Sequence, residues 1–209
     1  MLTTVLLLAL CFATNVVQGA TADSRGNTFA RYELTNWTVH SLPSFPRAPV
    51  QIPGHVTLDA FPAINPYSGS AEVELSTFSL LAWTYETTIH WDLVAIRPNE
   101  VMQLYFEKLD TVATVSIDGE DLKNSRGEVV VDNYFIPHVF ELRRPNGASS
   151  SVLVVKIKSS LLEARQRARR YSQDNQSYPH TVNYHVWSEP THRNTLRKPA
   201  SDFGWVRQM

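Results

Sequence analysis

The sequence predicts an all-β sandwich or barrel that forms one folded domain. From Tyr85 onward, short segments alternate polar and apolar residues and are rich in β-branched and aromatic types, as strands are. Turn signals such as Asp118-Gly119 and Pro145-Asn146-Gly147 separate these segments at regular spacing. With 209 residues, of which 43% are hydrophobic, the chain can bury one ordinary core, and a second full domain is not expected.

The predicted strands begin in the N-terminal third and continue to residue 160. They are residues 32–40, 85–93, 101–109, 111–119, 127–136, 138–143 and 151–160. In the last of them the apolar run from Val152 to Val155 supplies both faces, so both faces of its first half are expected to be buried. Four prolines within residues 41–61 remove backbone donors, and this stretch is expected to run as an extended edge or loop segment.

One helix is predicted after the last strand. Ser160 and Glu163 have the spacing of a capping box with Ser160 at the N-cap, and alanines in residues 161–171 favour helix. The same segment is the most basic of the chain, with arginines at positions 165, 167, 169 and 170. A patch for an anionic ligand is one interpretation; a solvated helix face is favoured, because no aromatic residues are interleaved with the arginines.

The N-terminus has the features of a secretory signal peptide over residues 1–22. An apolar run over residues 5–13 is followed by small residues that suit cleavage within residues 19–22. The run is shorter than the roughly 20 apolar residues of a membrane span, so no membrane partner is predicted. The only cysteine, Cys11, lies in this segment, and the mature chain is expected to contain neither disulfides nor cysteine metal sites.

Acceptor sequons fit passage through the secretory pathway. Asn36-Trp37-Thr38 and Asn175-Gln176-Ser177 predict glycans on Asn36 and Asn175, in a protein of the lysosome or the extracellular space. A net charge of -1 and a pI near 6.7 give no reason to expect nucleic acid or an anionic membrane as partner. The sequence contains no phosphate-cradling glycine loop and no serine nucleophile elbow, and no cofactor is predicted.

Several segments occur in an order typical of a known family. They are ELTNWTV, VQIPGHVTLDAF, LYFEKLDTVATVSIDG and RKPASDFGW, within roughly residues 30–205. In this order they resemble the N-terminal domain of β-mannosidases in glycoside hydrolase family 2. The resemblance implies a jelly-roll β-sandwich related to galactose-binding modules, with one or two short helices, over residues 29–175. Residues 176–209 are similar to the segment that follows the strands in those enzymes.

The resemblance also implies an activity that this chain alone lacks the means to perform. In complete enzymes of the family, a (β/α)8 barrel carries two catalytic glutamates that hydrolyse terminal, non-reducing β-linked mannose by a retaining mechanism. The two carboxyl groups then lie about 5–5.5 Å apart. Nothing in this chain matches the barrel, so no catalytic residue is assigned and no turnover is expected. A carbohydrate partner is expected for the complete enzyme, and the oligomeric state is not predicted.

Trp205 is the candidate substrate-binding residue. It matches the first Trp of a family loop that contacts the sugar, whereas Val206 and Arg207 replace the Asp and the second Trp that follow. Valine offers no acceptor to a sugar hydroxyl. We interpret the abrupt change as the mark of a chain cut short before the catalytic barrel. Alternatively, Trp205 packs on the sandwich and closes the domain.

Two other functions stay open for the chain. It is either a free-standing, secreted, lectin-like module that binds carbohydrate without catalysis, or a structural domain that only packs against a barrel. An independent active site is not favoured, because Glu189 lies near His192 but has no second placed carboxylate. A metal site is not predicted either, because His180, His185 and His192 are spaced by five and seven residues, which puts no ligands on one helix face.

Overall fold

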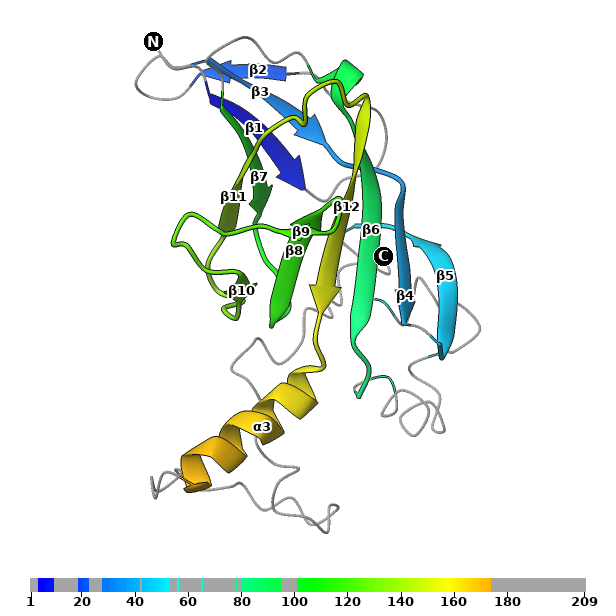
Figure 1. The fold of residues 1–209 in the computed structure, drawn as a ribbon, viewed down its shortest axis with the longest axis vertical. Coiled ribbons are helices and arrows are strands. Elements are labelled where there is room, and N and C mark those ends of the chain that lie inside the picture. The colour runs from blue at the N-terminus through cyan, green and yellow to red at the C-terminus, as the bar shows by residue number, and fades with distance from the viewer. Residues whose placement is uncertain are drawn as a thin grey trace.

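Two β-sheets pack against each other through one apolar layer, and a helix extends from one end of the sandwich (Figure 1). The structure is a computed structural model. It describes residues 4–9, 19–22, 28–41, 43–52, 56, 65, 78, 80–94 and 101–173. Within these ranges it describes side chains from Tyr32 to Arg170, apart from Val101, Ala168 and Arg169. The predicted all-β sandwich is confirmed. The predicted domain limits, 29–175 and 176–209, extend past the described residues and stay a prediction.

The larger sheet is antiparallel in all its pairings and has β12 and β6 at its centre. In spatial order its strands are β10 (Val130–Val131), β8 (Ala113–Ile117), β12 (Ser150–Ile157), β6 (Trp83–His90), β4 (Trp37–Ser41) and β5 (Phe45–Val50). The short strand β9 (Glu120–Asp121) pairs with β8 only. Because β12 pairs along its length with β6 and over much of it with β8, its backbone is the best-anchored of the sheet.

The smaller sheet is mixed, because its central strand runs parallel to both neighbours. Its order is β11 (His138–Leu142), β7 (Val101–Phe106), β1 (Thr4–Ala9), β3 (Thr28–Glu33) and β2 (Gly19–Ala22). Leu6 of β1 pairs with Gln103 on one side and Arg31 on the other. Both β1 and β2 fall within the predicted signal peptide. Cleavage there would remove β1, which pairs with both β7 and β3. The signal peptide itself stays a prediction.

The period-two alternation of the strands places one face of each sheet in the common core. The fully buried members include Leu104 and Phe140 from the smaller sheet and Ile89, Val115 and Leu153 from the larger. The two inner faces interdigitate there, as they do in sandwiches generally. The core therefore unites segments that lie more than 60 residues apart in the sequence.

The structure corrects the predicted strands at three places. The predicted strand 32–40 is divided between β3 and β4, which belong to different sheets and are separated by residues 34–36. The segment 127–136 contains only the short strand β10, because turns, bends and irregular backbone occupy the rest of it. In β12, Leu153 is fully buried, whereas Val152 on the opposite face is 44% exposed. The expectation that both faces are buried is therefore wrong at Val152. An antiparallel sheet in a two-layer sandwich covers only one of its faces, so apolar residues on the outer face stay exposed.

The predicted helix is present as α3 (Ser160–Gln173), but its cap is one residue earlier than expected. The hydroxyl of Ser159 accepts a hydrogen bond from the Leu162 backbone N–H at 3.1 Å, so Ser159 and not Ser160 is the N-cap. Glu163 instead forms an ion pair with Lys158, with the Nζ and Oε1 atoms 3.2 Å apart. Because Ser159 and Ser160 are adjacent, the sequence alone does not show which hydroxyl caps the helix.

One of the helix arginines ties α3 to the sandwich. The guanidinium of Arg167 lies 3.0 Å from the Asp132 carboxylate in the loop after β10. Arg165 is half-buried, and its Nε atom has no hydrogen-bond partner among the described residues. These contacts fit the favoured interpretation of the basic segment as a helix face, with arginine stems lying on apolar surface.

Replacing Leu153 with alanine tests the position of the core. We expect Leu153→Ala to lower the free energy of unfolding by about 2–5 kcal/mol, because it leaves a cavity between the sheets. The neighbouring Val152→Ala is the matched control, and its cost should stay below about 1 kcal/mol because that side chain already faces solvent. Urea denaturation followed by circular dichroism measures both. Equal costs for the two variants would contradict the assigned register of β12.

Candidate functional site

Of the site residues that the sequence predicts, the structure describes Asn36. Trp205 and Asn175 lie outside the described residues, so their predicted roles stay predictions. Four C-terminal residues for which neither catalysis nor metal binding was predicted also lie outside the described residues. They are Glu189, His180, His185 and His192.

Asn36 lies on an exposed turn immediately before β4. Its backbone φ of 58° is in the left-handed region, which asparagine tolerates better than most residues. The neighbours on both sides are anchored. The indole N–H of Trp37 donates to the Leu34 carbonyl at 3.0 Å, and the Thr87 hydroxyl donates to the Thr35 carbonyl at 2.6 Å. Held in this way, the turn keeps the Asn36 amide accessible to solvent.

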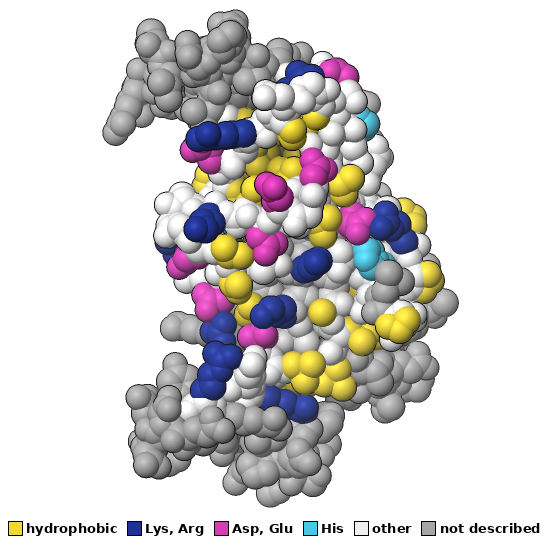
Figure 2. All heavy atoms as spheres, viewed as in Figure 1, with side chains coloured by type: hydrophobic (Ala, Val, Ile, Leu, Met, Phe, Trp, Pro, Cys, Tyr) yellow, Lys and Arg dark blue, Asp and Glu magenta, His cyan; other side chains and the backbone are white. Residues whose placement is uncertain are grey.

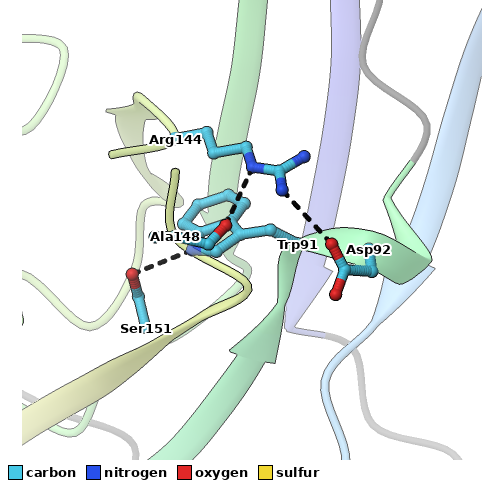
Figure 3. A network of polar contacts seen from close by, with 5 residues as sticks. All are labelled: Trp91, Asp92, Arg144, Ala148 and Ser151. Atoms are coloured by element: carbon cyan, nitrogen blue, oxygen red, sulfur yellow. Dashed lines mark hydrogen bonds and ion pairs between the residues drawn. The ribbon is translucent and has the colours of Figure 1, made fainter. Parts of the chain in front are cut away.

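A buried indole organises one end of the sandwich (Figure 3). Trp91, in the short 3-10 helix η1 (Trp91–Leu93) after β6, is fully buried, and its Nε1–H donates to the Ser151 hydroxyl at 2.8 Å. Its backbone N–H donates to the Ser149 carbonyl, also at 2.8 Å. Since a buried indole N–H needs an acceptor, these bonds fix η1 on the start of β12.

An exposed arginine links the same end of the sandwich to the β11–β12 turn (Figure 3). The Nη2 atom of Arg144 lies 3.2 Å from the Asp92 carboxylate, and its Nε–H donates to the Ala148 carbonyl at 3.1 Å. Both side chains are substantially exposed, so the pair contributes little to stability. The arrangement is a brace between two connections.

A second polar cluster lies on the outer face of the larger sheet. Glu86 of β6 forms an ion pair with Arg47 of the edge strand β5, and its Oε1 atom lies 3.8 Å from Nε2 of His40 on β4. Nδ1 of His40 is buried and has no hydrogen-bond partner among the described residues. The Arg47 side chain is more than half exposed, which limits the strength of the pair. The cluster joins three neighbouring strands.

One aromatic side chain offers a flat apolar surface to solvent. Phe135 is 56% exposed, and its backbone N–H donates to the Asn133 side-chain oxygen at 2.9 Å. Its ring lies edge-on to the buried Tyr134, with centroids 5.6 Å apart, and the Lys108 ammonium lies over the Tyr134 ring. A ring held in this way is suited to contact the apolar face of a sugar, or a neighbouring protein surface.

Neither a cluster of metal-ligand side chains nor a membrane-spanning helix occurs among the described residues. Within these ranges no three His, Cys, Asp or Glu side chains are grouped so as to hold a metal ion. None of the described helices is long and apolar enough to cross a membrane. In Figure 2, Lys and Arg side chains are interspersed with Asp and Glu over the described part of the visible face.

Comparisons with known proteins converge on one group. Residues 22–206 match the family described as glycosyl hydrolase 2 galactose-binding domain-like. A probable beta-mannosidase of Caenorhabditis elegans is 25% identical over 174 residues, which cover 81% of this chain and 18% of that protein. For beta-mannosidase A of Aspergillus niger the identity is 27% over 172 residues, covering 81% and 17%.

A solved structure supports the fold. The crystal structure of a beta-D-mannosidase from Dictyoglomus thermophilum aligns with a TM-score of 0.56 and 20% sequence identity, over 75% of this chain and 18% of that one. At this identity the likeness establishes the fold alone. The chain spans less than a fifth of the length of each of these three proteins.

The Trp91–Ser151 hydrogen bond is open to a direct test. We expect Ser151→Ala to lower the free energy of unfolding by about 1–3 kcal/mol, because it leaves a buried indole N–H without an acceptor. Ser150→Ala, in the adjacent exposed position of the same strand, is the matched control and should be close to neutral. Thermal unfolding followed by tryptophan fluorescence distinguishes them. A neutral Ser151→Ala variant would show that the bond does not hold η1 in place.

Proposed function

This chain belongs to the glycosyl hydrolase 2 galactose-binding domain-like family, and we propose that it is the N-terminal domain of a β-mannosidase. The observation that carries the proposal is that the Caenorhabditis elegans and Aspergillus niger relatives are named beta-mannosidases and match this chain over most of its own length. The complete protein would hydrolyse terminal, non-reducing β-D-mannose residues of oligosaccharides and glycoproteins. Its carbohydrate partner would be a β-mannoside or an N-glycan fragment.

In this proposal the sandwich is a rigid scaffold and the acid–base chemistry belongs to another part of the protein. A retaining glycosidase needs two carboxyl groups about 5–5.5 Å apart on opposite sides of the scissile bond. Among the described residues, Glu86, Asp92 and Asp132 each form an ion pair with an arginine. These carboxylates serve the fold, so the catalytic pair is assigned to the region of the relatives that this chain does not cover.

We further propose that the protein follows the secretory pathway to the lysosome or the extracellular space. Residues 1–22 would act as its signal peptide, and Asn36 and Asn175 would carry glycans. The exposed position of Asn36 supports the first of these sites, because an acceptor amide must be open to solvent to receive a glycan. Trp205 is proposed to contact the sugar from the segment that follows the sandwich.

Antibody capture of the natural protein tests the proposed enzyme. An antibody against residues 83–157 should bring down an activity that hydrolyses 4-nitrophenyl β-mannoside in preference to the β-galactoside and β-glucoside. The purified 209-residue chain serves as the control and should show no turnover, because the proposal assigns the paired carboxylates of the mechanism to a region of the relatives that this chain does not cover.

Two outcomes would overturn this assignment. Hydrolysis by the 209-residue chain alone would show that the catalytic groups lie within it. Absence of β-mannosidase activity from the captured protein, together with binding of the chain on a glycan array, would favour the free-standing carbohydrate-binding module instead. In that case Phe135→Ala tests whether the exposed ring contributes to glycan binding.

Glycosylation at Asn36 is predicted for the protein expressed in a mammalian secretory host. Asn36→Gln should abolish one glycan and shift the protein to higher mobility on a denaturing gel, because the amide that carries the sugar is gone. The matched variant Asn175→Gln reports on the second sequon. If peptide-N-glycosidase digestion gives the wild type and Asn36→Gln the same mobility change, Asn36 is not modified.

A further inference from the structure

The turn between β11 and β12 contains an unprotected Asn-Gly pair. The backbone N–H of Ala148 donates to the Pro145 carbonyl at 3.1 Å, which places Asn146 and Gly147 at the two central positions of the turn. Both central residues are exposed. Gly147 has a φ of 74°, and a Cβ built on it would meet no atom within 4 Å, so the space around the turn is open.

Neither reacting group of this pair is restrained by the fold. Among the described residues, no hydrogen bond engages the Asn146 side chain or the Gly147 N–H. Glycine lacks a Cβ that would hinder approach of its nitrogen to the preceding side chain. From this geometry we propose that Asn146 is a site of spontaneous deamidation and isoaspartate formation. The proposal is independent of the proposed function.

The chemistry needs only water as co-reactant. The Gly147 nitrogen loses its proton to hydroxide and attacks Cγ of Asn146, so that a nitrogen–carbon bond forms while the Cγ–Nδ2 bond breaks and ammonia leaves. Water then opens the cyclic imide at either carbonyl, giving aspartate or isoaspartate. No oxidation or reduction occurs. The product carries one additional negative charge, and the isoaspartate form adds one methylene to the main chain.

Two comparable positions are protected by hydrogen bonds. The Asn124 side-chain oxygen accepts from the backbone N–H groups of Arg126 and Glu128, at 3.0 and 2.9 Å, and its Nδ2 donates to the Glu128 carboxylate at 2.7 Å. Asp118, which also precedes a glycine, accepts the Val152 N–H at 2.8 Å through Oδ1. Each side chain must release these bonds before it can cyclise, whereas Asn146 is free to react.

Isoaspartate at position 146 would act on the brace at this end of the sandwich. The turn supplies the Ala148 carbonyl that accepts from Arg144, whose guanidinium also reaches Asp92 (Figure 3). A methylene inserted between Arg144 and Ala148 changes the length of the chain that closes this contact. We therefore place the structural effect of the modification at the β11–β12 turn, away from the buried Trp91.

Incubation of the folded 209-residue chain at neutral pH and body temperature tests the proposal. Peptide mapping by mass spectrometry should show a gain of about one dalton at Asn146 at least about tenfold faster than at Asn124. At Asn124 three hydrogen bonds must break first, and the following residue is Ser125, whose Cβ hinders cyclisation. Incubation of the same chain in urea separates the effect of the folded structure from that of the local sequence. In urea the difference between the deamidation rates of Asn146 and Asn124 should narrow, because Asn124 loses its hydrogen bonds. Isoaspartyl methyltransferase labelling should locate the product in the peptide that contains residue 146.

The conservative variant Asn146→Gln provides the control, because its longer side chain cyclises far less readily. It should remove the acidic form that accumulates on ion exchange during incubation of the wild type. Persistence of that form in Asn146→Gln would overturn the assignment. The assignment would also be overturned if Asn146 deamidated in urea but stayed intact in the folded chain for as long as Asn124. That result would show that the turn protects Asn146.

Discussion

The apolar layer between the two sheets is the constraint on which the rest of the structure depends. Leu153 and Phe140 lie at its centre and are completely buried, and they come from opposite sheets. Without a cysteine after position 11, the described sandwich has no covalent cross-link to support it. Burial of apolar surface, at roughly 25 cal/mol per Å², therefore supplies the main favourable term in its folding.

That constraint explains where the polar groups of the molecule lie. Trp91 can be buried at the end of the layer only because the Ser151 hydroxyl accepts its indole hydrogen. Polar groups outside the apolar layer can hydrogen-bond to water and need no partner within the protein. Asn36 and Asn146 lie on exposed turns, where the chain can change its chemistry without disturbing the core. The same separation makes one turn suitable for a glycan and leaves the other open to deamidation.

Most strands could be predicted from the sequence because polar and apolar residues alternate along them, which is a local signal. The helix could be predicted because its composition is also a local signal. Features that depend on contacts between distant residues could not be predicted. The sequence offers no sign that Trp91 and Ser151 meet across 60 positions, or that Val152 faces solvent while Leu153 does not. The shift of the cap from Ser160 to Ser159 depends on where β12 ends, which adjacent serines do not reveal.

The same separation bears on where chemistry can occur in a protein of this family. A retaining glycosidase must hold two carboxyl groups a few ångströms apart with no cation between them, so that one can attack and the other can donate a proton. In the described sandwich, Glu86 contacts Arg47, Glu128 accepts from Asn124, and these carboxylates belong to different structural features. Their partners hold them in place, which suits a scaffold. In the β-mannosidase that we propose, a scaffold of this kind would leave bond cleavage to a separate domain.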